Sequence, residues 1–337
     1  MADNSGTVLI TGGAGYVGSH VAKALRAAGY ETVIFDNLFA GHPEAALGSR
    51  LIVGDITDVD SVRKAIRESG AVAVMHFAAW LSVSDSIKDP LGYYHNNVIG
   101  TLTTLEAMAT EGCRCFIFAS TCAVYGEPHE LPLSEDHVTE PISPYGQTKL
   151  TIEQVLPNFE HSYGIRSISL RYFNAAGADP EGKLGEDHFP EIHLIPRALA
   201  AAIGKIPIEI FGEDYPTPDG TCLRDYVHVS DLASAHILAL KHLVSGGASN
   251  IFNVGTERPY SVKEVLAVVE SVTGYRVACH SAPRRAGDPA VLYASAERIR
   301  AVLGWKPSYS DLARIINDAW QWHQKHPDGF ANDNHAE

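Results

Sequence analysis

A glycine-rich loop near the start of the chain limits the possible folds more than any other feature. The apolar run at 7–11 leads directly into Gly12, Gly15 and Gly18, and a helical pattern follows over 16–28. Glycines at this spacing allow a tight turn in which backbone N–H groups approach a pyrophosphate, and the helix N-terminus attracts the same anion. The loop therefore predicts the first βαβ unit of a dinucleotide-binding fold.

Strand and helix patterns continue to alternate over the first half of the chain. Strands are expected at 32–35, 51–53, 71–77, 116–118 and 167–172, and helices at 59–69, 92–111 and 145–160. Repeated βα units of this kind imply an α/β fold with a Rossmann-type, doubly wound parallel sheet. Beyond about 175 the chain is richer in loops, with shorter helices expected at 194–203, 231–244, 261–273, 296–303 and 311–324.

The chain has 337 residues, which is enough for about two domains. We expect an NAD-binding Rossmann domain over 1–175, to which the chain returns at about 225–255. A smaller C-terminal α/β domain over 176–337 would bind most of the substrate, so the site is expected in the cleft between the two.

Composition excludes several classes of partner. The net charge is −14, which disfavours nucleic acid and anionic membrane surfaces, because both are bound through Lys and Arg. No apolar run reaches the roughly 18 residues of a membrane span. The five cysteines match no zinc-binding spacing, and the sixteen histidines form no recognisable ligand pattern. We therefore expect a cytoplasmic protein with no metal site.

An acidic residue indicates which dinucleotide is bound. Asp36 ends the second expected strand, 18 residues after Gly18. A carboxylate at this place accepts hydrogen bonds from the adenosine ribose hydroxyls and repels a 2′-phosphate. The sequence therefore predicts NAD rather than NADP.

A tyrosine and a lysine provide candidate acid–base chemistry. Tyr145 and Lys149 are four residues apart, so they share one face of the helix expected at 145–160. A nearby ammonium and an oxidised nicotinamide ring would lower the pKa of the phenol, so that Tyr145 could remove a hydroxyl proton. Thr121 follows the strand at 116–118, in the crevice where ligands bind such sheets, and could hydrogen-bond the reacting oxygen.

Several longer segments together resemble the extended, nucleotide-sugar branch of the short-chain dehydrogenase/reductase superfamily, and within it the UDP-hexose 4-epimerases. The resemblance covers roughly 7–320 and is carried by ITGGAGYVGSH, IFDN, VGDITD, HFAA, YYHNNVIGT, FASTCAVYG, SPYGQTK, RYFNAAGADP, PTPDGTCLRDYVHV and RRAGDPA. It implies an isomerase that interconverts UDP-glucose and UDP-galactose. The C4 hydride would pass to a retained NAD⁺, the 4-keto sugar would rotate, and the hydride would return to the opposite face.

The resemblance also assigns site residues. Besides the glycine loop, the NAD site would include Tyr16, Val17, Asp36, Asn37, Asp55, Ile56, Phe77, Ala78, Ala79, Leu81, Asn96, Thr121, Tyr145, Lys149 and Phe173. The UDP-sugar would be held by Thr121, Tyr145, Asn174, His193, Leu194, Phe211, Arg224, Arg285, Asp288 and Leu292. Family members are commonly homodimers, through the helices at 92–111 and 145–160.

Three positions depart from the family pattern. His193 stands where some epimerases have Asn, and Leu81 where some have a Lys near the nicotinamide. Leu292 is at the position that limits the entry of N-acetylated sugars. A UDP-N-acetylglucosamine 4-epimerase, or an enzyme with both specificities, therefore remains an alternative.

Related functions are less compatible with the sequence. A 4,6-dehydratase needs an acid and a base after Thr121, where this chain has Cys122 and Ala123. A UDP-glucuronate decarboxylase usually has Glu in the place of Ala123. A non-catalytic NAD sensor would not need Tyr145 and Lys149. A simple sugar oxidase would accumulate NADH, whereas an epimerase would release none.

Overall fold

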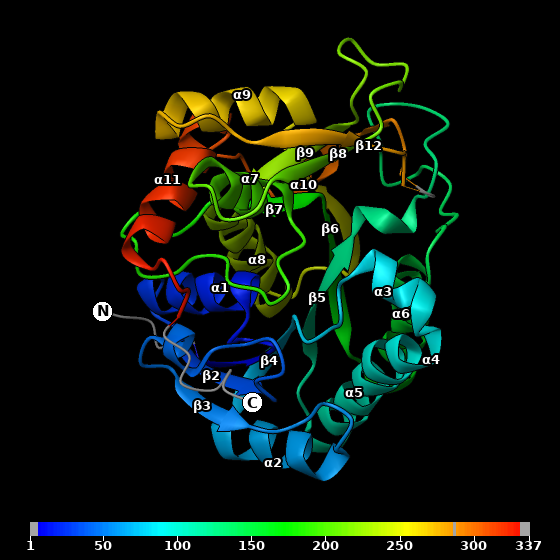
Figure 1. The fold of residues 1–337 in the computed structure, drawn as a ribbon. Coiled ribbons are helices and arrows are strands. Elements are labelled where there is room, and N and C mark those ends of the chain that lie inside the picture. Colours follow the sequence, from blue (N-terminus) through cyan, green and yellow to red (C-terminus); the bar gives the residue numbers. More distant parts are fainter. Residues whose placement is uncertain (1–5, 286–287, 331–337) are drawn as a thin grey trace.

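The computed structural model describes residues 6–285 and 288–330, so the RRAGDPA segment is described except for Ala286 and Gly287. A seven-stranded parallel sheet dominates the lower part of the molecule in Figure 1, in the order β10-β6-β5-β4-β1-β2-β3. Its strands are β1 (Thr7–Thr11), β2 (Glu31–Asp36), β3 (Arg50–Val53), β4 (Ala71–His76), β5 (Cys115–Thr121), β6 (Arg166–Tyr172) and β10 (Asn250–Val254). The predicted α/β fold with a doubly wound parallel sheet is confirmed.

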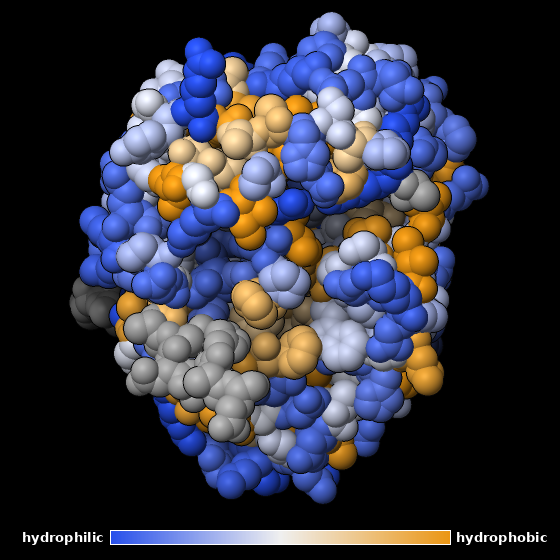
Figure 2. Space-filling model, viewed as in Figure 1, coloured by the Kyte–Doolittle hydropathy of each residue, from blue (hydrophilic) through white to orange (hydrophobic). Residues whose placement is uncertain are grey.

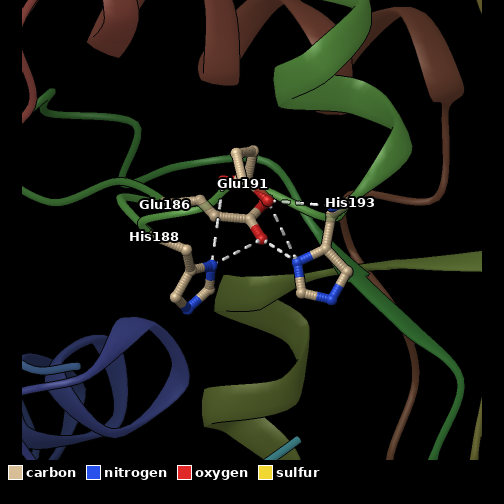
Figure 3. A group of neighbouring side chains, drawn as sticks. All are labelled: Glu186, His188, Glu191 and His193. Carbon is tan, nitrogen blue, oxygen red and sulfur yellow. Dashed lines mark hydrogen bonds and ion pairs between the residues drawn. The ribbon is translucent and has the colours of Figure 1, made fainter. Parts of the chain in front are cut away.

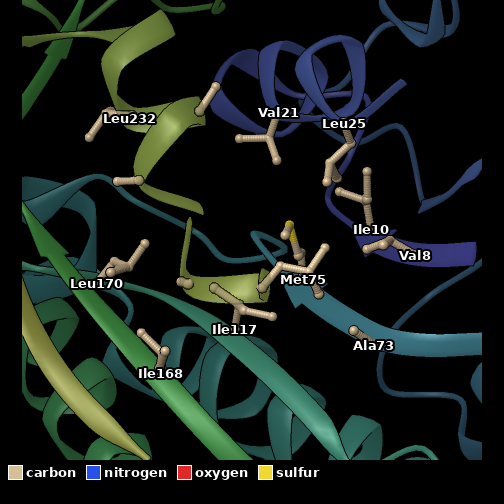
Figure 4. Close-up of a cluster of buried hydrophobic side chains, with 14 of the residues drawn as sticks. Val8, Ile10, Val21, Leu25, Ala73, Met75, Ile117, Ile168, Leu170 and Leu232 are labelled. Atoms are coloured by element: carbon tan, nitrogen blue, oxygen red, sulfur yellow. The ribbon is translucent and has the colours of Figure 1, made fainter. Parts of the chain in front are cut away.

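Helices cover both faces of this sheet, and most residues of its central strands are buried. One face is covered by α1 (Tyr16–Ala27) and α8 (Val229–Val244). Val21 and Leu25 of α1 meet Ile10 of β1 and Met75 of β4 in the core that Figure 4 shows. The other face packs against α2 (Val59–Ser69), α5 (Gly100–Glu111) and α6 (Pro144–Tyr163).

Strand order reverses between β1 and β4, because β2 lies on one side of β1 and β4 on the other. Ligands of open α/β sheets bind in the crevice outside the carboxyl ends of the strands at such a point. The glycine loop follows β1 and Thr121 ends β5. The fold therefore brings the predicted cofactor loop and catalytic residues to one edge of the sheet.

A second region is stacked on the carboxyl end of the large sheet, in the upper part of Figure 1. In it β9 (Leu223–His228) pairs with β7 (Asn174–Ala176), β11 (Pro259–Ser261) and β13 (Val291–Leu292), and β8 (Ile208–Phe211) pairs with β12 (Cys279–Ala282). The helices of this part are α7 (Leu194–Ala202), α9 (Val262–Thr273) and α11 (Leu312–Lys325), whereas α10 (Glu297–Leu303) packs against α8 and β10 of the large sheet. Core side chains from α7, α9 and α11 pack together with those of β7, β8 and β9.

The structure contains elements that the sequence patterns did not predict. The seven strands from β7 to β13 were missed, because five of them have four residues or fewer and show too little periodicity. The helix expected at 92–111 is divided into α4 (Pro90–Tyr93), a π-helical turn (Tyr94–Ile99) and α5, and α3 (Val83–Lys88) precedes it. Among the described residues, no helix is long and apolar enough to cross a membrane.

Candidate active site

The glycine loop has the backbone geometry that a bound pyrophosphate requires. Gly12 has a φ of +70°, and a Cβ there would lie 2.4 Å from the backbone nitrogen of Ala78. A Cβ on Gly18 would lie 2.3 Å from the carbonyl oxygen of Gly12. Gly15 precedes α1 without any side-chain cap, so the first N–H groups of the helix remain available to an anion. The loop thus fits a dinucleotide.

Asp36 lies where the adenosine ribose of such a dinucleotide would be recognised. It ends β2, is 8% exposed, and accepts hydrogen bonds from the backbone N–H groups of Ala14 at 3.0 Å and Leu38 at 2.9 Å. Burial raises the pKa of this carboxyl, and the two backbone hydrogen bonds oppose the rise. Asp36 is therefore tied to the glycine loop, and the pair of them fits NAD.

The remaining predicted cofactor residues line the same edge of the sheet. Asn37 donates to Asp55 at 3.0 Å, so the ends of β2 and β3 are joined by side chains. Phe77 and Ala78 follow β4, and their N–H groups donate to the carbonyl of Thr11 at 2.8 and 3.1 Å. The others in this part of the chain lie on the loops and helices that flank the edge: Tyr16, Val17, Ile56, Ala79, Leu81 and Asn96.

Three catalytic candidates meet where β5 ends and α6 begins. Ser143 caps α6 and Pro144 occupies its first turn, which places Tyr145 at the mouth of the crevice. The Tyr145 phenol lies close to Thr121, which lowers the pKa of the phenol. Lys149, one turn further along α6, is 4% exposed and donates to the carbonyl of Ala119 at 2.9 Å. Strand β5 thus fixes both side chains of the helix.

In the protein chain by itself, burial has the largest effect on the pKa values of Tyr145 and Lys149. Burial raises the pKa of Tyr145 well above its ordinary value, and Thr121 opposes this only in part. Burial also lowers the pKa of Lys149 to about 7, against the attraction of Glu153. The Lys149 ammonium lies 6.0 Å from the centre of the Tyr145 ring. The chain's own groups therefore keep Tyr145 neutral, and phenolate needs a further positive charge.

Behind this helix lies a buried polar network that the sequence analysis missed. Glu153 forms an ion pair with Arg171 at 2.5 Å and accepts from Ser120 at the same distance. Arg171 also donates to the hydroxyl of Tyr125 at 3.0 Å. Glu153 is four residues after Lys149, as Lys149 is four residues after Tyr145. The same helical spacing could therefore have predicted that Glu153 lies beside Lys149.

Two pairs of predicted substrate residues are in direct contact. Arg224 on β9 donates to Asp288 at 2.9 Å. The guanidinium of Arg285 lies 3.8 Å from the centre of the Phe211 ring, at the end of β8. Arginine offers forked donors that match phosphate oxygens. The second region therefore places two cations where they would offset the net charge of −14 locally.

Asn174, His193 and Leu194 line one pocket between β7 and the start of α7, together with Glu186 and Tyr226. The side chain of Asn174 donates to the carbonyl of Asp225 at 3.1 Å, which joins β7 to β9. On the face drawn in Figure 2, the surface is hollowed between the upper and lower parts of the molecule, and hydrophobic side chains are exposed inside the hollow.

Phe173 and Leu292 belong to one buried apolar cluster, although 119 residues separate them in the chain. Leu292 is 9% exposed and lies on β13, beside β9. The predicted nicotinamide contact and the predicted wall of the sugar pocket are thus close together. This arrangement is consistent with a hexose that lies beside the nicotinamide.

The sequence indicated no histidine–carboxylate group, but the structure contains one. Glu186, His188, Glu191 and His193 converge between β7 and α7, as Figure 3 shows. Burial disfavours the charged imidazoles, but the carboxylates of Glu186 and Glu191 outweigh it and raise the pKa of His188 to about 9 and that of His193 to about 10. The residues lie close in sequence, but their irregular spacing of two, three and two residues matched no motif.

The parallel sheet, the glycine loop at its switch point and the tyrosine–lysine pair define a dinucleotide-dependent enzyme of the Rossmann type. The sequence profile of the NAD dependent epimerase/dehydratase family matches residues 8–255. The chain belongs to this family.

The similar proteins narrow the class further. The UDP-glucose 4-epimerase of Lacticaseibacillus casei is 46% identical over 330 residues, which are 97% of this chain and 100% of that protein. The crystal structure of UDP-glucose 4-epimerase from Brucella ovis in complex with NAD has 46% identity and a TM-score of 0.92, and the match covers 94% of this chain and 97% of that one. The enzyme from Bifidobacterium longum, in complex with NAD⁺ and UDP, has 35% identity and a TM-score of 0.91 over 96% and 100% of the chains.

Proposed function

We propose that this protein is an NAD-dependent isomerase that interconverts UDP-glucose and UDP-galactose by inverting C4 of the hexose. The observation that carries the proposal is the position of Tyr145. It lies at the start of α6, close to Thr121 at the carboxyl edge of the sheet, beside a glycine loop that fits a dinucleotide and below a second region that carries Arg224 and Arg285.

The residues that would hold NAD are those of the glycine loop, with Asp36 on the adenosine ribose and Lys149 on the nicotinamide ribose. When bound, NAD supplies an acceptor for the C4 hydride that later returns it, and its oxidised ring supplies positive charge that favours the phenolate of Tyr145. This is the charge that the chain alone lacks. Phe77, Ala78 and Ala79 would close the site at the end of β4.

Tyr145 acts as the base that removes the proton of the 4-hydroxyl, and as the acid that returns it. Thr121 holds the reacting oxygen within reach of the phenol and can relay the proton. Inversion requires the 4-keto sugar to present its other face to the nicotinamide, so the pocket must hold the nucleotide firmly and the hexose loosely. Arg224, Arg285 and Asp288 would hold the diphosphate and uridine end, whereas Leu292 and Phe173 offer the hexose only apolar contact.

The deciding experiment is to incubate the purified protein with UDP-galactose, without added cofactor, and to resolve the sugars that form. We expect UDP-glucose to appear until both sugars are at equilibrium, with no net release of NADH. Accumulation of NADH would indicate a sugar oxidase instead. Turnover of UDP-N-acetyl sugars alone would contradict the proposed substrate, and turnover of both classes would show that Leu292 leaves room for the acetamido group.

The proposal includes a homodimer in the cytoplasm. Large apolar side chains are exposed beside α6, with Leu91 at 79% and Ile87 at 58%, and Ile99 before α5 is 46% exposed. Association through this surface would cover them. All five cysteines are unpaired, which favours a reducing compartment. Light scattering on the purified protein tests the dimer, and Ile99→Asp should shift it towards monomer; a wild-type monomer at micromolar concentration contradicts it.

A further inference from the structure

We propose that Glu186, His188, Glu191 and His193 bind one divalent transition-metal ion of the zinc type. All four side chains belong to the loop between β7 and α7, and they offer one ligand atom each within 4.8 Å of one another (Figure 3). Two carboxylate oxygens and two imidazole nitrogens form a donor set that zinc takes in proteins. The proposal does not depend on the reaction assigned above.

Three nitrogen–oxygen separations within the group are near the spacing of neighbouring ligands in a zinc site, although the two that involve Glu191 use different oxygens of its carboxylate. The Nδ1 atom of His188 lies 3.4 Å from Glu186 Oε1 and 3.8 Å from Glu191 Oε2, and His193 Nδ1 lies 3.5 Å from Glu191 Oε1. Zinc bonds to nitrogen and oxygen are about 2.0–2.1 Å long, so neighbouring ligands of a tetrahedral site are about 3.3–3.4 Å apart. His193 Nδ1 and Glu186 Oε1 are closer than this and would separate when an ion enters between them.

The polar atoms that face this point are buried and lack hydrogen bonds. Glu186 Oε1, His188 Nδ1 and His193 Nδ1 are inaccessible to solvent, and none makes a hydrogen bond of acceptable geometry. The side chain of Glu186 is only 5% exposed. The two imidazole nitrogens instead form ion pairs with the same oxygen, Glu186 Oε1. Buried polar atoms that lack a hydrogen bond are rare in native proteins, and one cation at the centre would bond to all three.

The surrounding loop holds the ligands in place. Glu191 Oε1 accepts from the backbone N–H groups of Ile192 at 2.7 Å and His193 at 2.8 Å, which fixes the carboxylate. The ring of His188 packs edge-on against Tyr16, with 6.3 Å between the ring centres. Partners of this kind orient the ligands of metal sites.

The donor set also distinguishes between metals. Imidazole suits zinc, cobalt and nickel, whereas magnesium and calcium prefer sites made only of oxygen atoms. An ion that binds must displace the protons of both imidazoles; the two glutamates then give the site a charge of −2, which a divalent ion neutralises. We therefore expect Zn²⁺ and Co²⁺ to bind, and Mg²⁺ and Ca²⁺ not to compete.

The ion would clamp a long loop of the substrate region. Residues 177–193 join β7 to α7 without regular secondary structure, and the four ligands are spread over their last eight positions. A metal bond to Nδ1 of His193 leaves Nε2–H as a donor, and His193 lines the pocket that also contains Asn174 and Leu194. Under the proposed function, the ion would thus stiffen one wall of the UDP-sugar site.

The test uses the full-length protein, stripped with a chelator and titrated with Zn²⁺ by calorimetry. We expect one equivalent to bind and the unfolding temperature to rise. His188→Gln and Glu191→Gln should each weaken binding by at least about 100-fold, since the loss of even a second-shell partner weakens metal sites by 10- to 100-fold. His280→Gln is the matched control. The imidazole of His280 is 58% exposed and lies opposite Glu209 in the pair formed by β12 and β8, so the substitution should leave zinc binding unchanged.

Anomalous scattering at the zinc edge, from crystals of the wild-type protein, locates the ion without any substitution. A peak among the four side chains supports the proposal even if a variant fails to fold. The proposal is overturned if no equivalent of Zn²⁺ binds, if the peak lies elsewhere, if His188→Gln binds as tightly as the wild type, or if Ca²⁺ competes equally. Because each readout follows the metal and not sugar turnover, the epimerase assignment can fail separately.

Discussion

The two parts of the molecule position their functional residues in different ways. In the large sheet, the backbone determines the position: Asp36 ends β2, Thr121 ends β5, and Lys149 is anchored to the carbonyl of Ala119. In the second region, side chains hold one another through ion pairs. Arg224 pairs with Asp288, and both His188 and His193 pair with Glu186. The first arrangement is suited to chemistry on a fixed cofactor, and the second can adjust to a sugar that must turn.

The pKa values of buried histidines also differ between the sheet and the loop of the second region. In the sheet region, burial lowers the pKa of His76 to about 3 and that of His236 to about 4, so these rings are neutral packing groups. In the loop of the second region, neighbouring carboxylates raise the pKa of His188 and His193 in spite of burial. His76 and His236 thus serve packing, whereas His188 and His193 favour the charged form. We expect substitutions in the sheet region to affect catalysis and stability, and those in the second region to affect affinity.

The strongest test of the sheet region is Tyr145→Phe. Removal of the acid–base group should lower kcat by roughly 10²- to 10⁴-fold, because that is the usual contribution of such a group. Folding and UDP binding should be retained. Tyr163→Phe, at the exposed end of the same helix, is the control and should turn over like the wild type. If Tyr145→Phe kept most of its activity, another residue would be the base.

Glu153→Gln tests whether the buried ion pair holds the catalytic helix. The side chains of Glu153 and Arg171 are 1% and 4% exposed, so the substitution leaves a buried guanidinium without its counter-ion. Loss of one partner of such a pair costs about 3 kcal/mol of unfolding free energy, which urea titration measures. Glu160→Gln, two turns further along α6, should cost far less. Equal losses in both variants would mean that the pair contributes little.

In the second region, the neighbouring residues Arg284 and Arg285 can be compared, because only Arg285 is expected to hold the UDP-sugar. Arg285→Lys would lose the contact with Phe211 and the forked donors, and should raise KM for the UDP-sugar by roughly 5-fold, equivalent to about 1 kcal/mol. kcat should change little. Arg284→Lys is the matched variant, because Arg284 pairs with Asp214 instead. An equal rise in KM for both would show that only the general charge of this segment matters.

The sequence predicted the sheet region far better than the second region. Strands β1 to β6 and their helices follow regular periodicities, and the ends of such strands must share one edge, so Asp36 and Thr121 could be placed in advance. The second region is built from strands as short as β13, with two residues, and from a loop whose order depends on contacts between distant side chains. No local pattern reveals that Arg224 meets Asp288, 64 positions later.

Electrostatics were predicted less well than positions, even in the sheet region. The spacing of Tyr145 and Lys149 correctly placed both on one helix, but their interaction depends on burial, which a spacing does not report. Burial dominates both pKa values and moves them in opposite directions, since it penalises phenolate and ammonium alike. The spacing therefore predicted the shared helix, whereas the acidity of the phenol also depends on burial and on the positive charge of the nicotinamide.

The smallest expected effect concerns stability in mild acid. His76 is 1% exposed and lies between the hydroxyls of Thr11 at 2.7 Å and Thr101 at 2.9 Å. Between pH 6.5 and about 3, this imidazole binds a proton in the unfolded chain but not in the folded one, so stability must fall as the pH falls. At pH 6 the loss from one such group is about 0.8 kcal/mol.

His76→Gln removes the titrating group but keeps a side chain that can hydrogen-bond both threonines. The drop in unfolding free energy from pH 7.5 to pH 6, measured by urea titration, should be smaller in this variant than in the wild type by about that amount. His129→Gln, on a side chain that is 63% exposed, should leave the drop unchanged. If His76→Gln lost as much stability as the wild type, the buried imidazole would already be taking up its proton in the folded state. The contrast between the histidines of the two regions would then no longer hold.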